Sequence, residues 1–401
     1  MIKKISCDFI YSLIASALPI IIIQLILYPT LSRFVDSSAY GLILTLMGVV
    51  NTIYISLGTP LNNTRLIQNE KYDEIKGDFN FLLIMANIIG AVLIITISIY
   101  IFQLTFLMIM GLILLTIISI TNSYLMVSYR LILDFKLYIC ISLMECIGYL
   151  IGISFLKIYS ELWIFAFIFA QFFSLLYLIF TCSLYKEPLT FTKYFKQTTI
   201  KYIWLVLSNI VSNALNYLDR LILFPLLGGT AVATFSTATF FGKSLSMILV
   251  PISGVLLSYL SQRDYKMTIK KYLYLNGLVF ILTISFVIFS YYASPWVTGL
   301  LYPTLINDSI QYIVIGNLGA IVGSATALCS PFIIKYAPSY WNFVVNGLYG
   351  ISYIVLGTTL LNYSGIYGFC IALLLANILR MTVTFIVGGI YIKKNRRIVE
   401  D

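Results

Sequence analysis

Apolar runs of membrane-spanning length alternate with short polar segments along the whole chain. A helix needs about 20 predominantly apolar residues to cross a bilayer. Twelve runs meet this requirement, and only a turn around Gln103 separates the third from the fourth. The pattern predicts an all-α polytopic membrane protein with transmembrane helices over residues 9–32, 39–61, 79–102, 104–127, 137–156, 162–184, 202–227, 231–260, 272–293, 309–334, 341–361 and 367–391.

A lysine-bearing polar segment near mid-chain divides these runs six and six. Similar stretches recur on its two sides: Tyr28-Pro-Thr-Leu-Ser-Arg with Ala39-Tyr-Gly-Leu, and Phe224-Pro-Leu-Leu-Gly-Gly with Ala233-Thr-Phe-Ser. Halves of six spans each keep the same orientation, as in transporters built from parallel repeats. We therefore expect an N-lobe over residues 1–184, a cytoplasmic linker over 185–201 and a C-lobe over 202–401, arranged around a central cavity.

The composition and the placement of basic residues agree with a membrane location. The 401 residues are 60% hydrophobic and 10% charged, and the mean hydropathy is +0.98. Twenty of the 25 Lys and Arg residues, Lys71, Arg263 and Lys266 among them, fall in loops on one side, whereas only Arg33 and Lys157 lie in loops on the other. The positive-inside rule then predicts that both termini are cytoplasmic. The net charge of +10 indicates attraction to anionic membrane lipid and not nucleic-acid binding.

Two residue types exclude several kinds of chemistry. Histidine is absent, which removes His-based acid–base catalysis and imidazole metal sites. The six cysteines are scattered along apolar stretches without metal-binding spacing. We therefore expect no metal site, no cofactor, no structural disulfide and no enzymatic activity.

The seventh run carries the clearest candidate site. Asn209, Asn213, Asn216 and Arg220 follow one another at intervals of four, three and four residues, which places them on one face of a helix. Asp219 adjoins Arg220 in the same run. Ionised groups at membrane depth cost several kcal/mol and by default indicate a functional site.

Further charged residues lie inside other runs. Lys243 is in the eighth, Glu145 in the fifth, and Arg380 in the twelfth, where Asn377 shares its helical face. If Asp219 neutralises Arg220, then Lys243 and Arg380 leave a cationic surplus that favours an anionic passenger. Arg33 and Arg65 lie at the expected mouths of the cavity. Structural roles also stay open for these residues. Asp219 and Arg220 would form an ion pair that only stabilises the fold, and the Lys243 side chain would extend toward the membrane surface. Glu145 would either pack between helices or carry a proton.

Several motifs resemble a known family. The stretch from Leu218 to Ala238, LDRLILFPLLGGTAVATFSTA, is similar to the Asp-Arg, glycine turn and aromatic pattern of the polysaccharide-unit (O-antigen, Wzx-type) flippases. Ala39-Tyr-Gly-Leu, Leu300-Leu-Tyr-Pro and Tyr363-Ser-Gly-Ile-Tyr-Gly also fit this family. The family belongs to the multidrug/oligosaccharidyl-lipid/polysaccharide exporter superfamily, and the resemblance covers nearly the whole chain.

The resemblance implies a flippase of the bacterial inner membrane. It would move an undecaprenyl-pyrophosphate-linked oligosaccharide, such as an O-antigen unit, to the periplasmic leaflet by alternating access. Arg220, Lys243 and Arg380 would hold the pyrophosphate. The sugar hydroxyls would contact asparagines: Asn209, Asn213, Asn216 and Asn377. Other polysaccharide assembly proteins are expected partners.

Two alternatives remain. A cation-coupled multidrug exporter of the same superfamily would share the fold and would use buried acids for coupling. Asp219 and Glu145 are the candidates, because the first run has only Asp8, at its edge. A glycan polymerase has a similar number of spans, but such enzymes carry catalytic residues on a large outer loop. The longest outer loop here, residues 294–308, has one acid and no basic residue.

Overall fold

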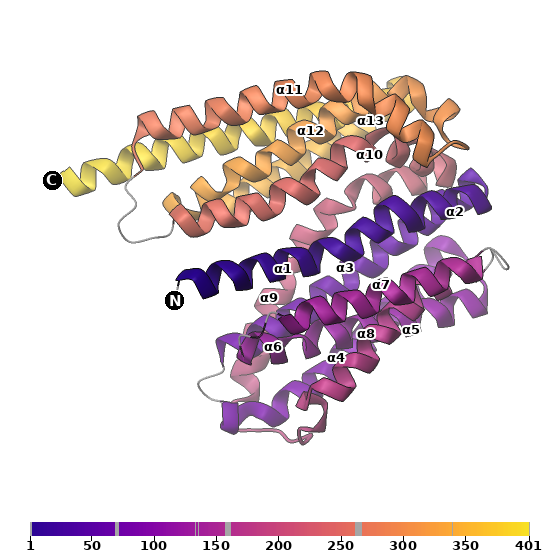
Figure 1. Cartoon of the computed structure of the whole chain (residues 1–401), viewed down its shortest axis with the longest axis vertical. Coiled ribbons are helices and arrows are strands. Elements are labelled where there is room, and N and C mark those ends of the chain that lie inside the picture. The colour runs from indigo at the N-terminus through magenta and orange to yellow at the C-terminus, as the bar shows by residue number, and fades with distance from the viewer. Residues whose placement is uncertain are drawn as a thin grey trace. The chain divides into compact units, whose positions relative to one another are not determined.

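The computed structural model describes residues 2–68, 72–132, 134, 136–156, 162–260, 267–338 and 340–400 (Figure 1). Nearly all of these residues are helical, and none of them is in a β-strand. Lys71, Lys157, Arg263 and Lys266, which contribute to the predicted topology, lie outside the described residues, as does the side chain of Asp8. The all-helical class predicted from the sequence is confirmed.

The described chain divides into two compact units. The first comprises residues 1–36 and 43–217, and the second comprises residues 37–42 and 218–401. The division falls after Tyr217, whereas the sequence suggested a linker at 185–201. The helices of the first unit are α1 (Ile2–Ile22), α2 (Tyr28–Phe34), α3 (Ser37–Ile67, from Ile43 onward), α4 (Tyr72–Ile97), α5 (Phe106–Leu125), α6 (Val127–Ile132), α7 (Lys136–Leu156), α8 (Ile164–Thr181) and α9 (Phe195–Asn216).

Four long helices form most of the second unit. They are α10 (Leu218–Leu260), α11 (Ile269–Leu301), α12 (Ile306–Tyr336) and α13 (Tyr340–Glu400), and α12 packs against each of the other three. Two of the four are bent at glycines with left-handed backbone angles, Gly228 (φ 78°) and Gly365 (φ 59°). Glycine adopts such angles without the steric cost that a Cβ atom would add.

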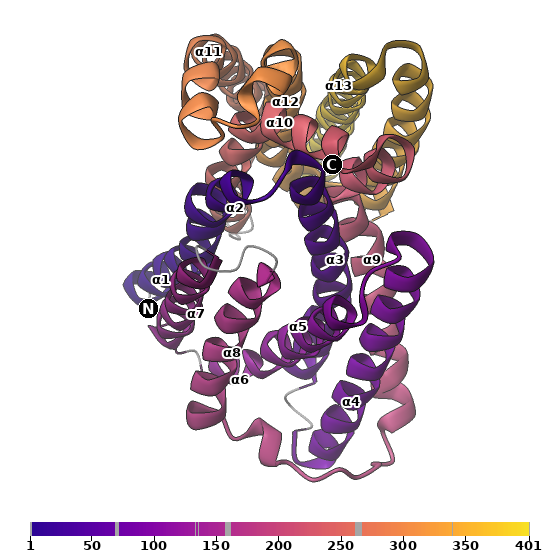
Figure 2. The same ribbon diagram turned by 90° about the vertical axis from the view of Figure 1, so that its right-hand side faces the viewer.

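The bend at Gly365 reverses the direction of α13. A Cβ atom on Gly357 would touch the ring of Phe369, and one on Gly368 would meet the carbonyl of Leu360, so the two arms run side by side (Figure 2).

Ten segments of the described chain are long and apolar enough to cross a membrane. Dividing α10 and α13 at their glycines, and joining α9 to the residues before Gly228, gives the twelve predicted passes. The protein is a multi-pass membrane protein.

The hairpin predicted around Gln103 is present. A π-helical turn, Ser98–Phe102, ends at Gln103, which has a left-handed backbone (φ 49°), and α5 begins at Phe106.

Apolar side chains remain exposed along the membrane-spanning helices. In α11, for example, only 11% of the most apolar window is buried inside the protein, as expected for a surface that faces lipid.

The seventh pass differs from its prediction because the helix breaks at Tyr217. This residue has non-helical angles (φ −116°, ψ 10°) and closes the C-terminal end of α9. Its hydroxyl accepts a hydrogen bond from Asn51 Nδ2 at 3.1 Å, and its ring lies against Gly48 of α3. At its other end α9 begins at Phe195, seven residues before the predicted start.

One short segment of α3, residues 37–42, belongs to the second unit. A Cβ atom on Gly41 would collide with the backbone of Gly229, and one on Gly229 would collide with the Ser38 carbonyl. Tyr40 also packs on Tyr302, with ring centroids 6.3 Å apart. The two glycine-bearing stretches that recur in the sequence therefore lie in direct backbone contact.

Candidate functional site in the second unit

An ion pair inside α10 is the first element of the candidate site. Lys243 Nζ donates to Asp219 Oδ2 across the bend at Gly228, and the Asp219 side chain is only 6% exposed. The Lys243 side chain is 39% exposed, and its amine also lies 5.3 Å from the centre of the Phe235 ring. The pair therefore has a buried anion and an accessible cation.

The preceding residue, Gly242, fixes the position of Lys243. Asn317 Oδ1 accepts a hydrogen bond from the Gly242 N–H at 2.7 Å, and Ser324 Oγ donates to the Gly242 carbonyl at 3.1 Å. Both partners are on α12. A Cβ atom on Gly242 would come within 2.8 Å of Ala320 and of the Asn317 carbonyl. Close contact with α12 thus requires glycine here.

The pairing corrects one expectation from the sequence. The sequence suggested that Asp219 neutralises its neighbour Arg220 and that Lys243 stays without a counter-charge. Side chains of adjacent helical residues point about 100° apart, and the carboxylate of Asp219 is instead paired with Lys243. Arg220 is half-buried and adds to the electrostatic environment of Asp219.

Arg380 is held by neutral groups. Its Nη2 donates to Asn346 Oδ1 at 2.8 Å, and its guanidinium carbon lies 4.9 Å from the centre of the Tyr349 ring. Asn346 and Tyr349 are on the first arm of α13 and Arg380 is on the second. No carboxylate pairs with Arg380 among the described residues. Its positive charge is therefore not offset by a carboxylate in this part of the structure.

A row of aromatic rings connects Arg380 to the ion pair. Successive ring centroids are 5.8 Å apart from Tyr349 to Tyr353, 5.3 Å from Tyr353 to Phe369 and 5.0 Å from Phe369 to Phe235. The Tyr353 hydroxyl is buried and has no hydrogen-bond partner. The structure thus brings Asp219, Lys243 and Arg380 together through one aromatic layer.

The charges in this part of the protein sum to a positive value. Asp219 and Lys243 offset each other as an ion pair, whereas Arg380 has no carboxylate partner in the described part of the chain and adds a positive charge. Guanidinium groups bind phosphate oxygens with paired hydrogen bonds, and ammonium groups bind them as point charges. The arrangement is suited to an anionic group such as a phosphate.

The asparagines have other surroundings. Asn377 is buried, donates from Nδ2 to the Gly319 carbonyl at 3.1 Å and lies against Gly323 on α12. In α9, which belongs to the first unit, Asn209 and Asn213 donate to carbonyls four residues earlier in their own helix, and Asn216 is exposed. The break at Tyr217 interrupts the continuous stripe that the sequence predicted up to Arg220.

Glu145 lies in the first unit among neutral donors. Its Oε1 accepts from Gln171 Nε2 at 2.9 Å and from the Tyr149 hydroxyl at 3.3 Å. Gln171 in turn accepts from Asn122 Nδ2 at 3.0 Å. No Lys or Arg side chain pairs with Glu145 in the described part of the chain. Such a carboxyl group is able to hold a proton.

The two expected mouth residues differ in exposure. Arg33 is exposed at the end of α2. Arg65 is buried and forms a two-pronged ion pair with Glu187, with N···O distances of 2.6 and 2.8 Å. It also donates to the Tyr124 hydroxyl at 3.0 Å and lies 4.8 Å from the centre of the Phe79 ring. Arg65 therefore fastens the segment after α8 to α3.

Several contributors to these sites were missed by sequence reasoning. Asn346 and Tyr349 lie at helical spacing in the eleventh run, on the arm that packs against Arg380, so a search for polar partners of Arg380 would have suggested them. Asn317 gives no signal of its own. No group of three or more His, Cys, Asp or Glu residues in the described ranges is placed to hold a metal.

No family model matches the chain, and no curated protein matches its sequence. Solved structures do match its fold. A multidrug resistance MATE family transporter of the MOP superfamily, in an inward-facing conformation, is 14% identical over 96% of this chain and 99% of its own, with a TM-score of 0.70.

Two further structures match with similar coverage. The lipid II flippase MurJ, in an inward closed conformation, is 15% identical over 96% of this chain and 86% of its own, with a TM-score of 0.66. A mutant of the Vibrio cholerae MATE transporter VcmN is 14% identical over 96% of this chain and 95% of its own, with a TM-score of 0.61. These likenesses concern the fold alone: this chain has the same two-lobed, all-helical fold as these structures.

Proposed function

We propose that this protein is a flippase for a lipid-linked oligosaccharide whose pyrophosphate binds to the positive cluster of the second unit. The observation that carries the proposal is Arg380, a guanidinium at mid-pass whose partners, Asn346 and Tyr349, are both neutral. An unneutralised cation inside a membrane protein is costly unless a ligand of opposite charge binds it. Binding of a pyrophosphate to Arg380 would offset this free-energy cost during translocation.

The surroundings of Arg380 suit the rest of such a substrate. Aromatic faces next to a cation pack against sugar rings, and the accessible amine of Lys243 adds a second positive charge within the same layer. Arg220 supplies a third. The proposed cargo is an undecaprenyl-pyrophosphate-linked glycan such as an O-antigen unit, and the MurJ flippase with the same fold is named for a related class of lipid.

The proposed transport cycle is alternating access. The two lobes would expose the cationic cluster first to the cytoplasm and then to the periplasm. The proposed location is the bacterial inner membrane with both termini in the cytoplasm, where other polysaccharide assembly proteins would supply and receive the substrate.

The test compares Arg380→Gln with Arg380→Lys in cells that depend on this protein for surface glycan. Arg380→Gln is expected to abolish surface glycan and to accumulate the lipid-linked precursor, whereas Arg380→Lys retains part of the export because it keeps the charge. Lys394→Gln, an exposed residue later on α13, is the matched control. Normal export by Arg380→Gln at normal protein level would refute the proposal.

A second candidate function is a cation-coupled multidrug exporter. The observation in its favour is Glu145, a carboxyl group whose hydrogen-bond partners, Gln171 and Tyr149, are both neutral. Such a group would take up and release a proton during each cycle. If this function holds, Glu145→Gln sensitises cells to several cationic drugs while Arg380→Gln leaves drug tolerance unchanged. The opposite pattern, with glycan export lost in Arg380→Gln, would exclude it.

A further inference from the structure

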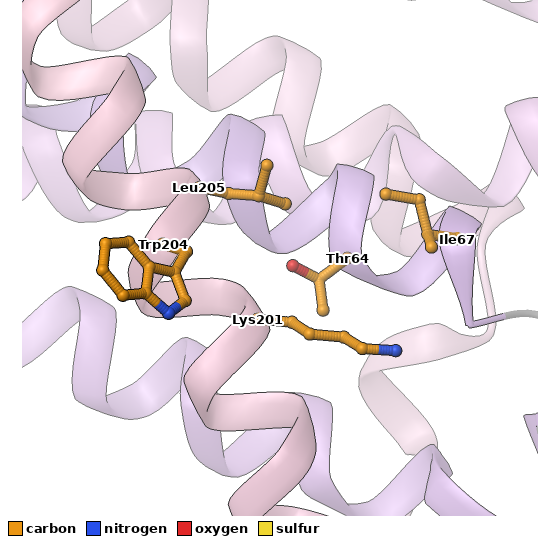
Figure 3. A pocket seen from close by; sticks show the side chains of 5 residues that line it. All are labelled: Thr64, Ile67, Lys201, Trp204 and Leu205. Atoms are coloured by element: carbon orange, nitrogen blue, oxygen red, sulfur yellow. The ribbon is translucent and has the colours of Figure 1, made fainter. Parts of the chain in front are cut away.

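A pocket lies between the end of α3 and the first half of α9, within the first unit. It has a volume of about 260 Å³ and is lined by Thr64, Ile67, Lys201, Trp204 and Leu205 (Figure 3). The basic residues of the loops assign this end of both helices to the cytoplasmic side. The pocket is remote in sequence from the cluster around Arg380 and plays no part in the proposed transport site.

The lining is apolar apart from one amine. The Thr64 hydroxyl is already bound to the Pro60 carbonyl at 2.7 Å, so Thr64 offers the pocket its methyl group. Ile67 is 66% exposed and Trp204 is 69% exposed. Large apolar side chains at such exposure are expected to face lipid, and tryptophan is enriched at the membrane interface.

The Lys201 side chain extends from α9 past Thr64 toward Ile67, along one side of the pocket (Figure 3). It has no carboxylate partner among the residues that the structure describes. Glu187, the nearest acid along the chain toward the N-terminus, is held by Arg65. An amine beside an apolar pocket therefore presents a positive charge at the level of lipid headgroups.

We propose that this pocket binds an anionic phospholipid of the cytoplasmic leaflet, with the phosphate on Lys201 and part of one acyl chain between Ile67 and Trp204. A pocket of about 260 Å³ with an apolar lining suits a short stretch of one acyl chain. Basic pockets between transmembrane helices on the cytoplasmic side bind anionic headgroups in this way.

The chemistry favours a phosphodiester over a pyrophosphate. One ammonium group matches the single negative charge of a phosphodiester, whereas a pyrophosphate calls for guanidinium groups or several cations. The pocket thus serves a lipid of the surrounding bilayer, and the inference is independent of which cargo the protein transports.

The test measures quenching of Trp204 fluorescence in proteoliposomes by brominated lipids. The contribution of Trp204 is obtained as the difference between the unaltered protein and Trp204→Phe. Brominated phosphatidylglycerol is expected to quench Trp204 at about a five-fold lower mole fraction than brominated phosphatidylcholine. This ratio corresponds to about 1 kcal/mol for one lysine near the membrane surface.

Two variants on α9 test whether Lys201 causes the preference for the anionic lipid. Lys201→Gln is expected to remove the preference for the anionic lipid, while Lys196→Gln, an exposed lysine outside the pocket, keeps it. Lys201→Arg is also expected to keep it, and raised salt should weaken it through screening. Equal quenching by both lipids, or an unchanged preference in Lys201→Gln, would overturn the proposal. Displacement by a polyprenyl diphosphate at a lower mole fraction than phosphatidylglycerol would overturn the choice of lipid.

Discussion

Removing the charge of Glu187 is expected to destabilise the first unit severely. Arg65 and Glu187 form two N···O contacts, at 2.6 and 2.8 Å, and their side chains are only 2% and 8% exposed. Breaking a buried pair by removing one partner costs about 3–5 kcal/mol because the other charge is left without compensation. The Tyr124 hydroxyl and the Phe79 ring stay in contact with the guanidinium, so Glu187→Gln should lie at the lower end, about 3 kcal/mol.

The assay is equilibrium unfolding of the purified protein in mixed micelles with a rising fraction of SDS. Proteolysis supplies a second readout, because the extended segment after Glu187 is held by a further pair of bonds from Thr192 to Asp78, at 2.7 and 2.8 Å. Cleavage in this segment should accelerate in Glu187→Gln. Lys196→Gln on the exposed side of α9 is the control and should change neither readout.

A double variant separates the ion pair from simple packing. Replacing both Arg65 and Glu187 with methionine removes the two charges together, so it should be more stable than Glu187→Gln alone. The reasoning is refuted if Glu187→Gln loses less than about 0.5 kcal/mol, the range of an exposed pair. It is also refuted if the double variant is the less stable of the two.

Two further changes test the second unit. Gly242→Leu should lower the yield of folded protein, because any Cβ atom at this position lies 2.8 Å from atoms of α12 and overpacking costs about 1–3 kcal/mol. Size-exclusion chromatography measures the yield of folded protein. A normal yield would contradict the close contact. Asp219→Asn should lower the midpoint temperature of thermal unfolding, because it leaves the Lys243 amine without its carboxylate partner. Adding Lys243→Met should recover part of this loss. If it recovers none, the result would argue against the ion pair.

The helical content of this protein is readable from its sequence because each pass must satisfy its backbone hydrogen bonds internally. Apolar length alone therefore located the passes, and Gln103 and Gly365 fell at real reversals. The helix break at Tyr217 could not be predicted from the sequence. It depends on Asn51 and Gly48, which lie far away in the sequence and contact Tyr217 only after folding.

The candidate site was predictable in its residue types and less so in its pairs. A charged residue inside an apolar run is conspicuous, so Asp219, Lys243 and Arg380 were identified from the sequence. Their partners were not, because pairing depends on the bends at Gly228 and Gly365 that bring distant turns together. Glu187 was missed because 122 positions separate it from Arg65 along the chain, so the two residues meet only after folding.

Flipping of a defined lipid by the purified protein tests the central proposal most directly. Proteoliposomes would contain a polyprenyl-pyrophosphate-linked oligosaccharide with a fluorescent sugar, and the fraction that reaches the other leaflet would be followed with a membrane-impermeant quencher. The unaltered protein should accelerate flipping well above protein-free vesicles, and Arg380→Gln should bring the rate back toward that background. A rate equal to protein-free vesicles, or one that Arg380→Gln leaves unchanged, would contradict a pyrophosphate-binding flippase.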